Sequence, residues 1–354
     1  MTDSRLQELT LWANDLLDHL LEHKQGFVDL EPVSGDASFR RYFRARIGDE
    51  SYIAVDAPPE HEDNQTFINL SNMFIAAGIL APKAYSVDFE RGFMLLVDFG
   101  DELYLPALLE AQQTGNTTQA ENLYSQALDS LVLIQEGIDK DRLPPFTREK
   151  LGSEMALFTE WFYGEYLQLK LDSKAQTICE AAFSWLAQQV DEQPKVAVHR
   201  DYHSRNLMVL DETKFGQASG PGVIDFQDAV RGSYAYDLVS LLRDCYIAWP
   251  LANVHEWANQ YRVKAQAAGL LATVSEQQLI RDMDICGMQR NLKVIGIFAR
   301  LSIRDNKSQY LADIPLVIRY FLTVSEQYEE LADFRAWFME SVLPQAKGKL
   351  QLDY

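Results

Sequence analysis

The hydrophobic positions of the first hundred residues change from a helical period to a strand period. Near the start, apolar residues recur at three- and four-residue intervals, which predicts an amphipathic helix. These residues are Leu6, Leu9, Trp12, Leu16 and Leu20. From about residue 27 to residue 98 apolar and polar residues alternate, with a helix expected at 63–77 and strands expected at 84–88 and 93–97. The pattern predicts a small sheet with one internal helix.

Beyond residue 98 the pattern is mainly helical to the end of the chain. The expected helices lie near residues 119–137, 150–168, 174–191, 234–248, 275–304 and 314–331. One β interruption is expected, a hairpin formed by the short runs 206–210 and 222–226. We therefore predict an α+β chain with a small, mostly antiparallel β lobe over residues 1–98 and a larger, mainly helical lobe over residues 99–354.

Composition and charge exclude several classes of protein. With 47% hydrophobic residues the chain is too apolar to be disordered, and its formal net charge of −20 disfavours nucleic acids and anionic membranes as partners. The three cysteines are far apart and lack a Cys-x-x-Cys spacing, so neither a disulfide framework nor a zinc site is indicated. No signal peptide or transmembrane run is evident, which predicts a cytoplasmic protein. The oligomeric state stays open.

The most informative segment is His-Arg-Asp-Tyr-His-Ser-Arg-Asn at residues 199–206, which has the spacing of a kinase catalytic loop. Phosphoryl transfer needs a carboxylate to orient the acceptor hydroxyl and oxygen ligands for Mg²⁺. Asp201, Asn206 and Asp225 supply these groups, and antiparallel pairing of the expected hairpin returns Asp225 beside Asn206. The alternative is a polar turn around an ordinary hairpin.

Further segments extend this pattern along the chain. They are Ser-Gly-Asp-Ala-Ser-Phe-Arg-Arg-Tyr at 34–42, Asp-Ala-Pro-Pro-Glu at 56–60, Asp-Phe-Gly-Asp at 98–101, Asp-Phe-Gln-Asp-Ala at 225–229 and Tyr-Asp-Leu at 236–238. From about residue 5 to residue 330 the chain resembles the bacterial anomeric N-acetylmuramate/N-acetylglucosamine kinases of the aminoglycoside phosphotransferase superfamily. The resemblance implies a bilobal protein-kinase-like fold. It also implies ATP-dependent phosphorylation of the anomeric hydroxyl of an amino sugar in cell-wall sugar recycling.

The resemblance also implies roles for the catalytic-loop residues. Asp201 is similar to the catalytic base or hydroxyl-positioning residue, and Asn206 and Asp225 are similar to the Mg²⁺ ligands. His199 and Asp237 would give structural support, with Asp237 bracing the loop from inside the fold. A buried helix-capping Asp is an alternative for Asp237 that is compatible with bracing.

ATP is expected to contact the N-terminal lobe. The turn at 34–38 contains a single Gly, although Ser34, Ser38 and backbone N–H groups suit a phosphate-facing turn, and a plain hairpin turn is equally compatible. Where protein kinases carry a phosphate-binding Lys, this chain has Asp56, so either the alignment is shifted here or another cation replaces the Lys. The candidates are Arg41, Arg40 and Lys83. The missing Lys also leaves open a catalytically silent nucleotide-binding module.

The adenine ring is expected where the two lobes join. Backbone groups at such a junction can pair with adenine, and the sequence changes there from sheet-like to helical. The hinge candidates are Leu96, Val97, Asp98 and Phe99. Their apolar character also fits an ordinary core strand.

The acceptor candidates lie around the catalytic loop. They are His203, Arg205 and Asp228. N-acetylmuramate carries a carboxylate that N-acetylglucosamine lacks, so a site for both needs a nearby cation. Arg205 is the first candidate, with Arg231 and Arg290 as alternatives. Arg290 shares a helical face with apolar residues, where reaching water is favoured over lining a cleft. Aminoglycosides, choline-like alcohols and other hydroxylated metabolites stay open as acceptors, because one fold can serve many substrates.

Overall fold

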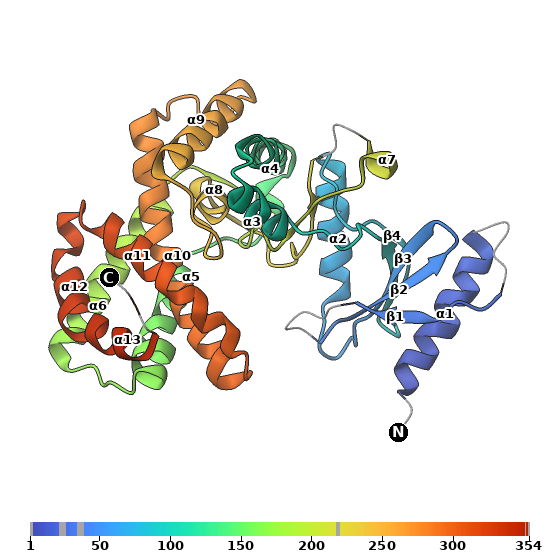
Figure 1. The fold of residues 1–354 in the computed structure, drawn as a ribbon, viewed down its shortest axis with the longest axis horizontal. Coiled ribbons are helices and arrows are strands. Elements are labelled where there is room, and N and C mark those ends of the chain that lie inside the picture. The colour runs from blue at the N-terminus through green and yellow to red at the C-terminus, as the bar shows by residue number, and fades with distance from the viewer. Residues whose placement is uncertain (1–2, 21–25, 34–38, 217–219, 351, 353–354) are drawn as a thin grey trace. The chain divides into compact units, whose positions relative to one another are not determined.

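The computed structural model describes residues 3–20, 26–33, 39–216, 220–350 and 352 (Figure 1). The chain forms two compact units. The first comprises Met1–Leu103 and Leu207–Gln227, and the second comprises Tyr104–Asn206 and Asp228–Tyr354. A segment from the middle of the sequence therefore belongs to the same unit as the N-terminal hundred residues.

The first unit is built on a five-stranded sheet in the order β1-β2-β3-β5-β4. All its neighbouring strands pair antiparallel. The strands are β1 (Leu30–Pro32), β2 (Arg41–Ile47), β3 (Glu50–Asp56), β4 (Ala84–Asp88) and β5 (Phe93–Val97). The chain passes from β3 to β4 through α2 (Asn64–Ala76), whose start is capped by Asp63. The predicted sheet with one internal helix is confirmed.

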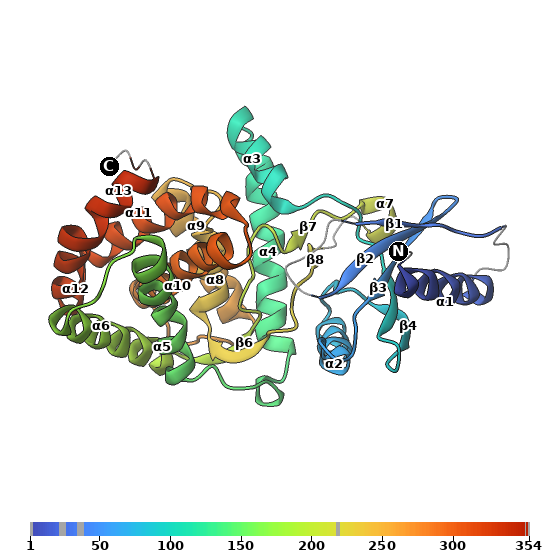
Figure 2. The same ribbon diagram turned by 90° about the horizontal axis from the view of Figure 1, so that it is seen from below.

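The opening helix α1 (Ser4–Leu20) lies along the sheet (Figure 2). Because side chains alternate across a strand, Phe43 and Ala45 of β2 point to the same face, where they join Leu9 of α1 in one apolar cluster. The indole ring of Trp12 packs against Phe93, with 5.8 Å between ring centroids. The apolar residues that recur along the first twenty positions are thus the ones with which α1 packs against the sheet.

The predicted hairpin is present and belongs to the first unit. It consists of β7 (Leu207–Met208) and β8 (Gly222–Val223), which pair antiparallel with Leu207 opposite Val223. Its tip includes the short helix α7 (Glu212–Phe215). The hairpin is fixed to the rest of the unit by Phe226, whose ring lies 5.2 Å from the rings of Phe67 and Phe74 on α2.

The second unit is mainly helical. Its α-helices are α3 (Tyr104–Thr114), α4 (Thr117–Gly137), α5 (Arg148–Leu157), α6 (Ser173–Glu192), α8 (Ala235–Leu242), α9 (Leu251–Ala267), α10 (Glu276–Arg304), α11 (Ile314–Ser325), α12 (Ala332–Trp337) and α13 (Leu343–Leu350). Helix α5 continues into a π-helical segment, Phe158–Tyr166. The predicted helices near 119–137, 174–191 and 275–304 are confirmed. No helix in the parts of the chain that the structure describes is long and apolar enough to cross a membrane.

Two predictions for this region are wrong. The hairpin is not the one β interruption, because β6 (Lys195–Val198) also pairs with β9 (Val230–Ser233). The helix expected at 234–248 ends at Leu242. Its continuation is prevented by Asp244, whose carboxylate accepts a hydrogen bond from the backbone N–H of Tyr246 and so favours a turn.

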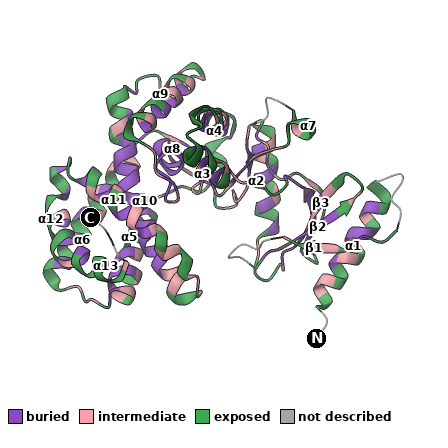
Figure 3. Cartoon of the chain, in the orientation of Figure 1, coloured by how far each residue is buried: buried purple, intermediate pink, exposed green. Residues whose placement is uncertain are grey.

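Helix α10 is the central element of the second unit. It is 29 residues long, and every residue from 282 to 296 is buried (Figure 3). A helix that is buried on all sides needs close neighbours. The closest approach is at Gly296, where an added Cβ would lie 2.3 Å from the carbonyl carbon of Leu157 at the end of α5. A side chain at residue 296 would therefore force the two helices apart.

We predict that Gly296→Ala destabilises the protein by about 1–3 kcal/mol, because the new methyl group overlaps backbone atoms that cannot rotate away. Gly152→Ala in α5 is the matched control. An added Cβ there meets no atom within 4 Å, so Ala should be neutral or stabilising by up to ~1 kcal/mol through helix propensity. Urea unfolding followed by circular dichroism measures both. Equal stability of the two variants would contradict the close approach.

Candidate active site

The catalytic loop follows β6 and is held from inside the second unit. Asp237 of α8 is fully buried, and its carboxylate accepts hydrogen bonds from the backbone N–H groups of His199 at 2.6 Å and Arg200 at 3.0 Å. Arg200 has a φ of +80°, a conformation that costs free energy for a residue with a side chain. The two bonds to Asp237 stabilise this backbone turn, as expected for a bracing residue.

A second carboxylate holds the far end of the loop. Asp244 accepts hydrogen bonds from the backbone N–H of Ser204 at 3.0 Å and from its hydroxyl at 2.6 Å. Within the loop, the amide nitrogen of Asn206 donates to the carbonyl oxygen of Asp201 at 2.9 Å. The relative positions of Asp201 and Asn206 are therefore fixed by hydrogen bonds inside one unit.

The Asp201 side chain lies among positive charges. It is 35% exposed, and its Oδ1 is 4.0 Å from Nζ of Lys293. Burial raises the pKa of the Asp201 carboxyl, but the charges of Lys293, Arg290 and Arg200 outweigh this effect and hold the pKa below its ordinary value. The carboxylate is therefore ionised at neutral pH and can accept a hydrogen bond from a substrate hydroxyl.

Lys293 is a site residue that the sequence reasoning missed. It lies on α10 with 5% of its surface exposed, and its Nζ is 3.2 Å from the hydroxyl of Tyr236 and 3.6 Å from a carboxylate oxygen of Glu154. Glu154 also pairs with Arg200 at 2.6 Å. The sequence did offer a signal for this role, because Lys293 lies in the middle of a helix whose pattern predicts burial, and a buried cation needs a carboxylate partner.

Arg290, one turn before Lys293, is not where the sequence suggested. The prediction that its guanidinium reaches water is wrong, because only 4% of the residue is exposed. The guanidinium lies over the ring of Tyr236, 5.4 Å from its centroid. The extensive burial of α10 leaves no route along which the side chain could extend to solvent.

The predicted acceptor residues lie in or near the catalytic loop, within the second unit. The guanidinium carbon of Arg205 lies 3.8 Å from the centroid of Tyr246, and the ring of His203 meets the same tyrosine edge-on at 5.4 Å. Burial lowers the pKa of His203. Asp228 has 66% of its side chain exposed, with Oδ1 3.8 Å from a guanidinium nitrogen of Arg200. The roles of these residues stay predictions.

Asp225 lies in the first unit, two residues after β8. Its φ is +64°, in the left-handed region that residues other than Gly seldom adopt and that is enriched at functional sites. The side-chain amide of Gln227 donates to its Oδ1 at 2.5 Å. The carboxylate is thus oriented by its own loop.

The hinge candidates lie at and just after the end of β5. Leu96 is 2% exposed and pairs with Ile53 of β3, and Val97 is the last residue of the strand. Asp98 is buried, and its carboxylate accepts hydrogen bonds from Arg44 at 2.6 and 3.1 Å. Burial raises the pKa of Asp98, but the Arg44 guanidinium outweighs this effect and keeps the pKa below its usual range. The ring of Phe99 is also buried.

Arg41, the predicted phosphate-binding cation, is bound to carboxylates of its own unit. Its guanidinium is 2.5 Å from Asp56 and also pairs with Asp3. Asp56 is fully buried and is bound by Arg5 of α1 as well, at 2.5 Å. The acid that stands where protein kinases have a Lys therefore ties α1 to the sheet. Its presence is explained by packing.

Arg40 has a different environment. It is 5% exposed, pairs with Glu62 at 3.0 Å and places its guanidinium 4.8 Å from the ring centroid of Phe67. The neighbouring predicted phosphate contacts, Ser34 and Ser38, lie outside the described residues.

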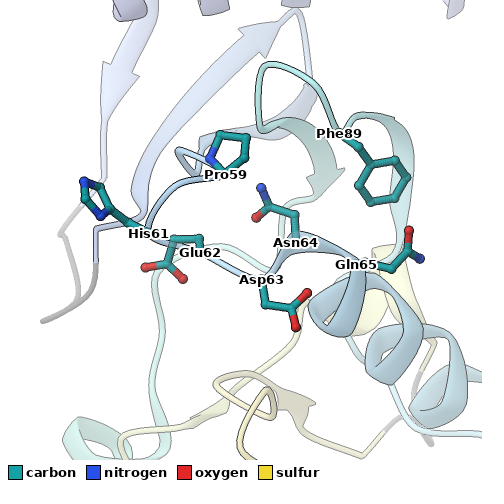
Figure 4. A pocket seen from close by; sticks show the side chains of 7 residues that line it. All are labelled: Pro59, His61, Glu62, Asp63, Asn64, Gln65 and Phe89. Carbon is teal, nitrogen blue, oxygen red and sulfur yellow. The ribbon is translucent and has the colours of Figure 1, made fainter.

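A pocket of about 480 Å³ opens at the start of α2 (Figure 4). Its lining residues are Pro59, His61, Glu62, Asp63, Asn64, Gln65 and Phe89. Glu62 is paired with Arg40, and the Asp63 carboxylate accepts the backbone N–H of Thr66. With two carboxylates and neither Lys nor Arg among its lining residues, this pocket is unsuited to a phosphate group.

Comparison with known proteins decides the family. Residues 29–272 match the model of the phosphotransferase enzyme family. The chain belongs to this family. Members named N-acetylmuramate/N-acetylglucosamine kinase from Pseudomonas aeruginosa and Pseudomonas putida are 38% and 37% identical to it, each match covering 94% of this chain and 95% of the relative. The predicted phosphotransferase and its resemblance to these kinases are confirmed.

Solved structures confirm the kinase-like fold of this phosphotransferase. The ethanolamine kinase of Plasmodium vivax superimposes with a TM-score of 0.59 at 12% sequence identity, covering 82% of this chain and 81% of the other. At so low an identity the similarity concerns the fold alone. The predicted α+β architecture, with an antiparallel N-terminal sheet followed by mainly helical structure, is therefore correct.

Asp237, which holds the catalytic loop, should make the stability of the phosphotransferase depend on pH. Burial raises the pKa of Asp237 from 3.8 to about 7. As the pH rises, an unfolded chain therefore loses this proton before the folded protein does, and unfolding is favoured between these two pH values. The stability of the wild type relative to Asp237→Asn should fall between about pH 4 and pH 7, by at most about 1.4 kcal/mol per pH unit.

Urea unfolding of both proteins from pH 4.5 to pH 8 measures this difference. The Asn side chain cannot titrate, so the variant subtracts all other ionisable groups. A difference that stays constant, or that grows with pH, would show that Asp237 is already ionised throughout the range.

Proposed function

We propose that this protein transfers the terminal phosphoryl group of ATP to the anomeric hydroxyl of N-acetylmuramate and N-acetylglucosamine in the cytoplasm. The observation that carries the proposal is the match to kinases named for these sugars over nearly the whole of both chains. The surroundings of Asp201 support it, since a partly exposed, ionised carboxylate is what the transfer needs. The three buried, unpaired cysteines are compatible with a reducing compartment.

We assign Asp201 the role of general base. Its carboxylate accepts a hydrogen bond from the anomeric hydroxyl and takes the proton as the sugar oxygen bonds to the γ-phosphorus. The bond between that phosphorus and the β–γ bridging oxygen breaks, and ADP leaves with its electron pair. Because Lys293 lies 4.0 Å from Asp201, the carboxylate keeps its position and charge in the ground state.

We assign Mg²⁺ binding to Asn206 and Asp225, whose side-chain oxygens are the donors that this ion prefers. The bond from the Asn206 amide nitrogen to Asp201 fixes which end of the amide is oxygen. Asn206 directly precedes β7, and β7 pairs with β8, the strand that leads to Asp225. When bound, the ion would neutralise charge on the nucleotide phosphates.

For the nucleotide we propose contacts from the 34–38 segment and from backbone groups at residues 96–99. Of the candidate cations, Arg40 is better supported than Arg41. Arg40 lies two residues after the 34–38 segment and is buried, and it pairs with Glu62. Arg41 would have to leave both Asp3 and Asp56 to bind a phosphate group.

A panel of acceptors tests the proposed function directly. N-acetylmuramate, N-acetylglucosamine, an aminoglycoside and choline are each supplied with Mg-ATP, and the position of the new phosphate is determined by phosphorus NMR. We expect a 1-phosphate on the two sugars. Phosphorylation of the aminoglycoside or choline in place of both sugars would overturn the proposal, and turnover of none would favour a silent nucleotide-binding module.

Asp201→Asn should lower the turnover number by about 10²–10⁴-fold, because the amide keeps the shape of the side chain but cannot take the hydroxyl proton. The affinity for Mg-ATP, measured by calorimetry, should stay within about twofold. Asp141→Asn is the control: it removes the same charge from an exposed residue that pairs with Arg231. Full turnover by a folded Asp201→Asn protein would remove Asp201 from its role.

Asp225→Asn should weaken the binding of ATP only when Mg²⁺ is present. Mg²⁺ should increase the affinity of the wild type for ATP. In Asp225→Asn this increase should be smaller by about tenfold or more, since a charged interaction of this kind contributes roughly 1.5–3 kcal/mol. Calorimetric titrations with and without Mg²⁺ measure this gain. The metal-free titration is an internal control, and an unchanged gain would exclude Asp225 as a metal ligand.

A further inference from the structure

One face of α10 carries a row of cations. Arg290, Lys293, Arg300 and Arg304 fall within an arc of about 80° when successive residues are turned by the helical angle. The contacts of Lys293 show which way this face points, because Lys293 lies beside Glu154 and Asp201. Arg300 lies two turns further along the same face, a rise of about 10 Å.

Arg300 forms no ion pair with the described residues, and it is less buried than Arg290 on the same helix face. Its Nε is buried, and it forms neither a hydrogen bond nor an ion pair with any residue that the structure describes. Burial and the neighbouring charge of Arg304 lower the pKa of Arg300. Arg304, in contrast, binds both carboxylate oxygens of Asp305, at 2.8 and 3.0 Å.

A partly buried cation without a partner is costly, and an anionic ligand would remove that cost. Two carboxylates lie close enough to influence Arg300, those of Asp305 and Glu160. The Asp305 carboxylate is already committed to Arg304, and Glu160 forms no ion pair with Arg300 among the described contacts. The positive charge of Arg300 is therefore available to a ligand.

The other candidate cations are less suited to this role. Arg231 is paired with Asp141 at 2.7 Å, and Arg290 is buried beneath Tyr236, where the charges of Asp201 and Asp244 reach it. The guanidinium of Arg205 lies over the ring of Tyr246, so one of its faces is covered.

We propose that Arg300 binds the carboxylate of the O-lactyl group of N-acetylmuramate, and so determines how well the enzyme uses this sugar relative to N-acetylglucosamine. The inference rests on the proposed function. The reacting hydroxyl is on C1 and the lactyl group is on C3, two ring positions away, so the carboxylate lies to one side of the reacting hydroxyl. Arg300 is displaced along α10 from Lys293, which lies beside Asp201, and a guanidinium on a long side chain can bind a carboxylate through two hydrogen bonds.

The test compares catalytic efficiency with the two sugars in wild type, Arg300→Gln, Arg300→Lys and Arg304→Gln. Arg300→Gln should lower kcat/KM for N-acetylmuramate by about 10- to 100-fold while changing that for N-acetylglucosamine by less than about twofold. Arg300→Lys keeps the charge but loses the paired hydrogen bonds, so its loss should be smaller. Arg304→Gln should also lower the value for N-acetylmuramate but not that for N-acetylglucosamine, because it frees the Asp305 carboxylate to neutralise Arg300.

Two outcomes would overturn the assignment. An equal loss of kcat/KM for both sugars would mean that Arg300 supports the fold of the site and does not bind the carboxylate. A selectivity change in Arg205→Ala but not in Arg300→Gln would transfer the role to Arg205. Wild-type activity on N-acetylglucosamine, which has no carboxylate, tests the proposed function separately. Melting temperatures of the variants show whether each one is folded.

Discussion

The carboxylate of Asp237 is the constraint on which the catalytic loop depends. The backbone N–H groups of His199 and Arg200 lie just beyond β6 and do not pair with a neighbouring strand. The buried side chain of Asp237 accepts a hydrogen bond from each of them. The strained backbone of Arg200 is thereby held, and the next residue, Asp201, takes its position from it. Since Asp244 fixes the other end of the loop, the carboxylate that we propose as the base is positioned by two other buried acids.

The positive charges of the protein are distributed in an uneven way. The chain as a whole has a formal charge of −20, yet Asp201 is approached by its neighbour Arg200 and by Lys293 and Arg290 of α10. Both proposed substrates that carry charge, ATP and N-acetylmuramate, are anions. An acidic exterior with cations gathered at the reacting carboxylate would favour these ligands at the site over the rest of the surface.

Sequence patterns predicted the parts of this structure that depend on local order. The period of residues 6–20 gave α1, and the spacing of Asp201 and Asn206 gave the catalytic loop, because both signals lie within one short segment. Lys293 was missed because its partner Glu154 is 139 positions away and on another helix. Arg290 was placed wrongly for the same reason: its burial depends on neighbours of α10 that no local pattern reveals.

The acid at residue 56 shows a further limit of reasoning from a motif. The missing Lys left a catalytically silent module open, whereas the structure shows Asp56 bound by Arg5 and Arg41, in ion pairs that tie α1 to the sheet. The pairing could not be seen in the sequence, because Arg5 lies in a helix that precedes the sheet and Arg41 lies on a neighbouring strand. An alignment to protein kinases therefore compares residues with different physical tasks.

The packing of Trp12 against Phe93 has a spectroscopic consequence. Of the six tryptophans, Trp12 alone belongs to the first unit, and the other five lie in segments of the second unit. A protein in which those five are replaced by Phe would emit from one indole at the contact between α1 and the sheet. Its fluorescence would report the unfolding of that contact, separately from the helical unit that carries Asp201.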